Sequence, residues 1–333
     1  MKKKNLLFVL AGLFLLVSCS NSEDDTAANQ GKAIEFRSVV DKTKASLVGN
    51  TDQLESFFVK GQEVSATTSV CTEYLSASVY KNASDWTYSP QKYWPVNDDV
   101  VNFYAFAPYS DAIRTSLDVT ADVADVKFSY TVPVNQSVQN TAVDLLVASK
   151  LDRKGSVTPT SPVALTFKHA LSAVTFSAKN KNATTSELVY TISKIEIVNL
   201  DNTGDYTYST EAWTENDTYD KTYIAGVPAS GVAVQPVGDV GAAVRLLSAN
   251  DVLIVLPQEV DVTTKVKITY SLKDGAGAYI YQDAERELVF PVTFDEFDAG
   301  KRYNFVFEFL ASNAITFSVT AVTDWGDDED VEE

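Results

Sequence analysis

The sequence is poor in the residues that carry most metal-binding and acid–base chemistry. Its 333 residues include one histidine and two cysteines. A tetrahedral zinc site needs several Cys or His ligands, and a Ser–His–Asp triad needs a histidine base. The single histidine, His169, shares the parity of Leu165 and Phe167 in an alternating segment, which predicts a structural side chain in the core. We therefore expect no enzymatic activity, no metal site and no cofactor.

Positive charge is also scarce. The chain has 27 Lys and Arg residues against 45 Asp and Glu residues, and its formal net charge is −18 at pH 7. This charge repels the phosphates of nucleic acids and anionic lipid headgroups, which argues against both as partners. Apolar residues make up 45% of the chain, enough to build cores, and the length favours two domains over one.

No apolar run is long enough to span a membrane. The longest, Leu6–Val17, follows three lysines and falls short of the ~20 residues that a spanning helix needs, an arrangement typical of a secretory signal peptide. The segment ends in Leu16-Val-Ser-Cys19, which resembles a bacterial lipobox. This resemblance implies that residues 1–18 are removed and that the Cys19 sulfur is acylated. Cys71 then remains as a single thiol, so we expect no intrachain disulfide and a small buried side chain at Cys71.

Residues 19–31 are polar and include three consecutive acids, Glu23–Asp25. Such a segment cannot pack, which predicts a flexible tether. Two interpretations of its acids stay open. They resemble the surface-export signal of some Gram-negative lipoproteins, and they also fit a linker that is acidic only because it is solvated.

Beyond the tether, short alternating segments predict β-strands. Val100–Ala107 is apolar at both parities, which predicts a central strand buried on both faces. After the alternating segment Val163–Leu171 the apolar parity shifts by one residue, which predicts a bulge or bend at Leu171–Ala173. The Tyr-, Thr- and Asp-rich segment Asp201–Tyr223 predicts a long exposed hairpin or loop.

Helical spacing is rare. The best candidate helix is Thr141–Ser149, and a weaker one is Asp111–Leu117. A cluster of Pro, Ser and Thr over Ser156–Pro162 predicts a domain boundary. Many short strands with frequent turn residues favour sandwiches. The sequence therefore predicts an all-β protein with two tandem β-sandwich domains, residues 32–160 and 161–333.

An aromatic turn allows two interpretations. Trp86, Tyr88, Tyr93 and Trp94 lie close together with two prolines. If the rings are exposed, Trp86 and Trp94 would form a platform on which sugar rings stack. If they are packed, the turn is a lid over a sandwich core.

Several blocks of the sequence resemble the fimbrillin family, the subunits of lipoprotein-derived pili in certain Gram-negative anaerobes. In chain order, these blocks are Ile34–Phe36, Thr43–Ala45, Val101–Pro108, Asp144–Ala148, Leu165–Leu171, Gly300–Tyr303 and a final strand ending in Trp325. Together they cover almost the whole mature chain. The resemblance implies two tandem β-sandwiches, no enzymatic activity and a place on the outer membrane. It also implies a role in adhesion, with other fimbrial subunits as partners.

The resemblance further implies a mechanism. In polymerising family members, a surface protease cuts after a basic residue near the start and removes the first strand, and a strand from another subunit fills the groove. Here the candidate residues for the cut are Arg37 and Lys44. The candidate donor strand is residues 314–325, which alternate and also fit an ordinary edge strand of their own domain. Its large or inward-facing residues are Ile315, Phe317, Val319, Ala321 and Trp325.

Other roles within the same resemblance stay open. Lys44 occupies the position where the family often has arginine, which an arginine-specific protease would not cut. Family members that keep their lipid act as pilus anchors or tips. The alternative to a polymerising subunit is thus a non-polymerising surface lipoprotein, either an anchor or tip or a glycan-binding adhesin.

Overall fold

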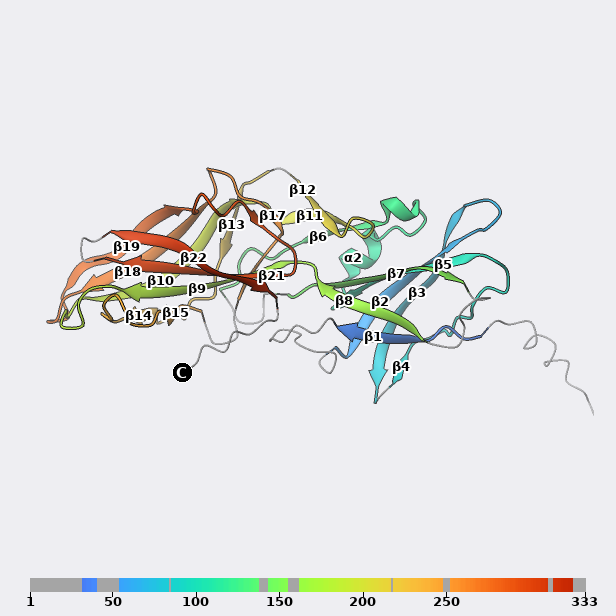
Figure 1. The fold of residues 1–333 in the computed structure, drawn as a ribbon, viewed down its shortest axis with the longest axis horizontal. Coiled ribbons are helices and arrows are strands. Elements are labelled where there is room, and N and C mark those ends of the chain that lie inside the picture. The colour runs from blue at the N-terminus through green and yellow to red at the C-terminus, as the bar shows by residue number, and fades with distance from the viewer. Residues whose placement is uncertain are drawn as a thin grey trace, which may run out of the picture.

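Alternating apolar residues build β-strands, which make up nearly all of the regular secondary structure of the described residues (Figure 1). The computed structural model describes residues 32–40, 54–83, 85–137, 143–154, 162–216, 218–247, 252–310 and 314–325. Within these ranges the helices are α2 (Asp111–Ser116) and the single 3-10 turn η1 (Val123–Asp125). Neither helix has the length and apolar character needed to cross a membrane. The predicted all-β class is confirmed.

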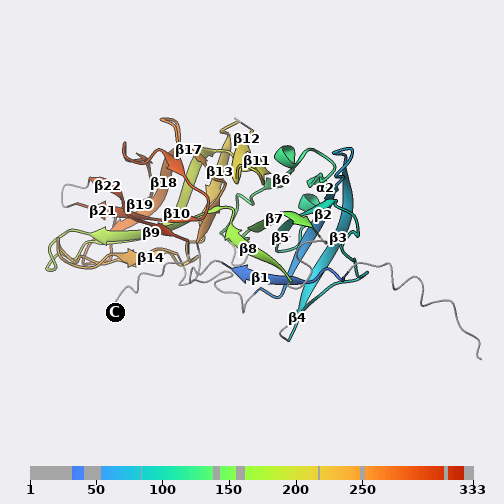
Figure 2. The same ribbon diagram turned by 45° about the vertical axis from the view of Figure 1, so that its right-hand side comes forward.

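Seven strands form the first sheet, in the order β1-β8-β7-β5-β2-β3-β4. They are β1 (Phe36–Val40), β2 (Ser56–Val64), β3 (Cys71–Asn82), β4 (Asp85–Thr87), β5 (Val100–Ala107), β7 (Leu146–Lys154) and β8 (Val163–His169). In both ribbon views these strands gather at one end of the molecule (Figures 1 and 2). The edge strand β1 runs parallel to β8, whereas the other pairs in the sheet are antiparallel.

The central strand β5 is buried on both faces, as its sequence predicts. Phe103 and Ala105 face one apolar cluster, here called the first core, which also contains Ile34 and Phe36. Tyr104 and Phe106 face the other side, where α2 and the later part of the chain pack. A strand between two cores needs apolar residues at both parities, which explains the continuous apolar run.

The remaining strands form four further sheets. A three-stranded sheet has the order β12-β11-β6, with β6 (Lys127–Thr131), β11 (Thr203–Thr207) and β12 (Ala212–Glu215). One five-stranded sheet contains β10 (Val189–Leu200), β13 (Lys221–Ile224), β14 (Val232–Val234), β18 (Lys265–Lys273) and β19 (Tyr279–Val289). The other contains β9 (Ser172–Asn180), β15 (Val244–Arg245), β16 (Leu253–Val255), β21 (Lys301–Phe309) and β22 (Ile315–Asp324). The strands β17 (Gln258–Glu259) and β20 (Glu296–Phe297) form a pair.

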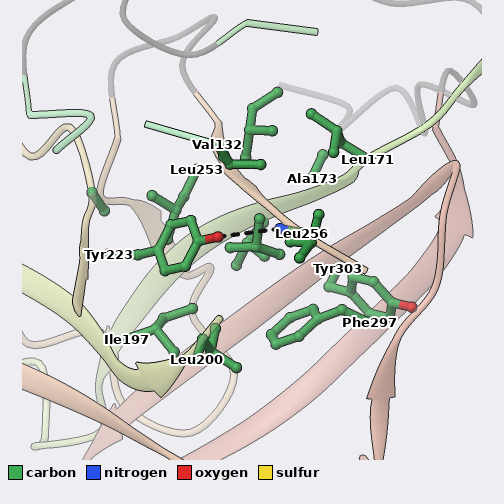
Figure 3. Close-up of a cluster of buried hydrophobic side chains, with 14 of the residues drawn as sticks. Val132, Leu171, Ala173, Ile197, Leu200, Tyr223, Leu253, Leu256, Phe297 and Tyr303 are labelled. Atoms are coloured by element: carbon green, nitrogen blue, oxygen red, sulfur yellow. Dashed lines mark hydrogen bonds between the residues drawn. The ribbon is translucent and has the colours of Figure 1, made fainter. Parts of the chain in front are cut away.

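The apolar cluster that contains Tyr104 and Phe106, here called the second core, extends from the first sheet into these later sheets, and Figure 3 shows part of it. Side chains from several distant segments meet there, including Ile197 from β10, Tyr223 from β13 and Tyr303 from β21. The Leu256 amide donates a hydrogen bond to the Tyr223 hydroxyl at 3.4 Å, so this buried phenol has a polar partner (Figure 3).

The shift in apolar parity after β8 marks a change of sheet. The chain leaves the first sheet at His169 and enters a different sheet at Ser172. The predicted bend at Leu171–Ala173 is therefore the crossing between the two halves of the molecule. The strand β8 follows the predicted boundary between residues 160 and 161 and pairs with β1 and β7 of the first sheet.

The two helix predictions have opposite outcomes. Asp111–Leu117 contains α2, whose N-terminus is capped by Ser110, since the Ser110 Oγ accepts the Ile113 amide at 3.3 Å. The prediction of a helix over Thr141–Ser149 is wrong. Its second half, Leu146–Ser149, belongs to β7, which pairs with β5 and buries Leu146, Val147 and Ala148.

Candidate functional site

The strand β1 forms one edge of the first sheet, where it is hydrogen-bonded to β8. Phe36 lies opposite Val163, and the register continues to Val40 opposite Phe167. The Val163 amide donates a hydrogen bond to the Glu35 carbonyl oxygen at 2.7 Å. Since β1 is the terminal strand of the sheet order, its loss would leave this edge of β8 unpaired.

The side chains of β1 and the residues before it also complete a core. Ile34 and Phe36 are buried, at 0% and 3% exposure. The Phe36 ring lies 5.4 Å from Phe103, 5.5 Å from Tyr88 and 6.1 Å from Phe57, measured between ring centroids. The Tyr88 hydroxyl donates a hydrogen bond to the Ile34 carbonyl oxygen at 3.0 Å. Removal of this segment would therefore open an aromatic pocket beside the free edge of β8.

The aromatic turn belongs to the same core. Trp94 is 4% exposed and packs edge-on against Phe103 at 5.8 Å. Trp86 is half-buried, and its ring lies 5.1 Å from Phe57. Trp94 is therefore buried and Trp86 lies partly against the core, which favours the packed interpretation of the turn; a sugar-stacking role for Trp86 and Trp94 stays a prediction.

The residues expected to be processed or lipidated are described only in part. Arg37 lies within β1, opposite Ala164, with its side chain exposed. Cleavage after Arg37 requires local separation of β1 from β8, since proteases act on locally opened chains. Lys44 and Cys19 lie outside the described residues, and their roles stay predictions.

The final strand β22 alternates as its sequence predicts. It pairs antiparallel with β21 alone and forms the edge of its sheet. Ile315, Phe317 and Val319 are half-buried and pack on the second core, while Thr316 and Ser318 are exposed. The candidate Ala321 lies in the same strand, opposite Asn304. Further aromatic contacts hold Phe317, whose ring centroid lies within 5.1–5.6 Å of those of Phe290, Phe305 and Phe307.

The end of β22 is fastened to the first sheet through Trp325. The Trp325 ring is 3% exposed and stacks on His169, with centroids 4.6 Å apart and planes 8° apart. His169, at the end of β8, places its Nδ1 2.9 Å from Asp144 Oδ1. The Trp325 amide donates a hydrogen bond to the Gly300 carbonyl oxygen at 2.7 Å. We call Trp325, His169 and Asp144 the clasp. The predicted inward position of His169 is confirmed.

Cys71 opens β3 and is half-buried, so it is more exposed than its sequence predicts. Burial and the nearby charge of Asp122 raise the pKa of its thiol. A raised pKa reduces the thiolate at neutral pH, and the thiolate is the reactive form. Cys71 is therefore a poor nucleophile.

Comparison with known proteins agrees with this architecture. A family model described as fimbrillin-like matches residues 41–325. The solved structure of a fimbrial protein from Bacteroides vulgatus ATCC 8482 superposes with a TM-score of 0.67 at 16% identity, covering 88% of this chain and 99% of that one. A candidate cell adhesion protein from Bacteroides ovatus ATCC 8483 gives 0.54 at 14% identity, with 89% and 99% covered. No curated protein matches the chain.

At these identities the solved structures establish a shared fold and nothing finer. The family match covers most of the chain. It begins at residue 41, directly after β1, and ends at Trp325 of the clasp. It includes β2–β8 of the first sheet and the sheets of the second core. On this evidence the chain belongs to the fimbrillin-like family.

Proposed function

We propose that the protein is a structural subunit of a cell-surface fimbria that assembles by strand exchange. Proteolysis removes Ile34 and Phe36 with the residues before them, and the whole of β1 where the cut follows Lys44; β22 of another subunit takes their place beside β8. The resulting fimbria supports adhesion. Members of this family are structural and adhesive proteins, and the chain is accordingly not an enzyme.

The observation that carries the proposal is the way β1 seals the first sheet. This short segment contributes two buried side chains, Phe36 from β1 and Ile34 from two positions before the strand. Their burial contributes roughly 1.5–3 kcal/mol for each side chain, which the cut subunit would lose. A subunit without β1 thus has both an unpaired strand edge and an empty aromatic pocket. Another alternating strand satisfies both needs by β-augmentation.

The last strand has the properties of a donor. It is an edge strand, so leaving its own sheet breaks one row of backbone hydrogen bonds. Its described inward side chains are Ile315, Phe317 and Val319, large enough to fill pockets at alternate positions. Release of β22 loses the packing of its side chains on the second core, chiefly the contacts of Phe317 with Phe290 and Phe305.

The proposal places the chain at the outer membrane before assembly. Acylation at Cys19 holds the precursor at the cell surface, and the cut at Arg37 or Lys44 separates the subunit from its lipid. The partners are other copies of this chain or minor fimbrial proteins. A non-polymerising anchor or tip is the second candidate, favoured by the pairing of the Arg37 backbone within β1, because a paired strand resists cleavage.

Deletion of residues 312–333 tests the donor role. We expect loss of high-mass polymers from the cell surface, with secreted monomer retained, measured by gel filtration and immunoblotting of surface material. Phe317→Ala is a milder variant of the same test, and Ser318→Ala is its matched control, because Ser318 is the next residue and faces solvent. Unchanged polymers in both the deletion and Phe317→Ala would overturn the donor role.

A further inference from the structure

The first strand segment and the last strand share an order of side chains. Each contains Ile-x-Phe followed by a polar residue, as Ile34-Glu-Phe36-Arg37 and Ile315-Thr-Phe317-Ser318. The Ile and Phe of both segments face a core. The residues between and after them are exposed, namely Glu35, Arg37, Thr316 and Ser318. Two strands that lie in different sheets therefore present the same apolar pair on the same parity.

The pocket around Phe36 selects among possible registers. It is lined by the rings of Phe57, Tyr88 and Phe103, which an aromatic side chain fills best. The aromatic residues of the last strand segment are Phe317 and Trp325. With Trp325 in the pocket, Thr323 would meet the site of Ile34, and a polar side chain would replace a fully buried apolar one. With Phe317 in the pocket, Ile315 meets that site.

The direction of the strand follows from the backbone. The Glu35 carbonyl accepts the Val163 amide at 2.7 Å, and β1 runs parallel to β8. A strand that repeats the order Ile-x-Phe in the same direction puts the Thr316 carbonyl where the Glu35 carbonyl lies. An antiparallel strand with Phe317 in the pocket would put Val319, not Ile315, in the site of Ile34. The parallel register keeps both the side chains and the hydrogen bond.

We propose that the incoming β22 lies parallel to β8, with Ile315 and Phe317 in the places of Ile34 and Phe36. This inference rests on the proposed strand exchange and adds its register and direction. After a cut at Lys44, which also removes Ser38, the same register puts Val319 at the position of that half-buried residue. An apolar side chain then replaces a polar one at a half-buried site, so the incoming strand fits the groove better than the strand it displaces.

Disulfide trapping tests the register. Arg37 lies opposite Ala164, so the proposal puts Ser318 of one copy opposite Ala164 of the next. Neighbouring strand positions lie within the Cα separation that a disulfide bridges. Both side chains lie outside the cores, so cysteine at either position leaves the packing intact. We expect the double variant Ser318→Cys with Ala164→Cys to turn most polymerised subunits into a ladder of linked chains on a non-reducing gel, and reduction to remove the ladder.

The matched control is Thr316→Cys with Ala164→Cys. Thr316 faces the same way as Ser318 but sits opposite Ala164 only if the strand is antiparallel or shifted by two residues. Each single variant controls for bonding to Cys71. A ladder from the Thr316 pair in place of the Ser318 pair would overturn the register. Intact polymers with no ladder from either pair would overturn it too, while leaving strand exchange standing. If the chain without these substitutions forms no polymers, both the register and the strand exchange are overturned.

Discussion

Replacing Phe36 with alanine is expected to lower the free energy of unfolding of the uncut mature chain by ~3–5 kcal/mol, the usual range for a buried Phe→Ala change. Phe36 is 3% exposed and touches three other rings, so its loss leaves a cavity at the edge of the first sheet. The measurement is the denaturant midpoint, with tryptophan fluorescence as the probe. Trp86 and Trp94 lie in this core and report on it directly.

Arg37→Ala is the control for this change. Arg37 is the adjacent residue in the same strand, and its side chain is exposed. A surface substitution of this kind changes stability by at most ~0.5 kcal/mol. Equal midpoints for Phe36→Ala and Arg37→Ala would contradict the account, because β1 would then add no packing energy to the first sheet.

Replacing Trp325 with alanine is expected to remove the clasp and to cost ~3–5 kcal/mol of stability. The indole is 3% exposed and stacked on His169, so the change deletes a large buried ring. We expect the effect to be strongest in β22, since Trp325 holds the end of that strand. Amide hydrogen exchange should therefore accelerate in β22 more than in β9 or β5.

The control for the clasp is Trp325→Phe, which keeps an aromatic ring against His169 and should lose much less stability. Exchange that rises equally in β22, β9 and β5 would contradict a local role for the clasp. Exchange that rises only in β22 would mean that the clasp restrains the donor strand in the uncut monomer. His169 and Asp144 belong to the first sheet region, so the clasp links the two halves of the molecule at the point where the chain crosses between them.

Local patterns in the sequence predicted single strands well. The continuous apolar run Val100–Ala107 is a central strand with a core on each face, and the alternation of Ile315–Val319 is the half-buried edge strand β22. Both predictions follow from the two-residue period of a strand, which depends only on neighbours in the sequence.

Features that depend on distant partners were harder to predict. The parity shift near Leu171 is visible in the sequence. Whether it is a bulge or a change of sheet depends on which strands pair with β9, and its partner β21 lies far along the chain. Asp201–Tyr223 was predicted to be exposed because it is rich in polar residues. In the structure Tyr206 and Tyr208 are buried against Phe128 of β6, a strand more than seventy residues earlier.

The candidate site shows the same division. The inward position of His169 follows from alternation alone, whereas its stacking on Trp325 joins residues from two different sheets and has no local signal. The aromatic turn was ambiguous for the same reason. Exposed and packed rings have the same sequence, and only the position of Phe57 and Phe103 favours the packed turn.

The most direct test of strand exchange is the mature N-terminus of the protein taken from surface polymers, determined by mass spectrometry of intact subunits. Strand exchange requires a start at Ser38 or Ala45, directly after Arg37 or Lys44, so that Ile34 and Phe36 are absent from every polymerised subunit. Subunits that still begin at an acylated Cys19 and retain residues 32–37 would contradict it. The protein would then be an anchor, a tip or a static surface lipoprotein whose first strand stays in place.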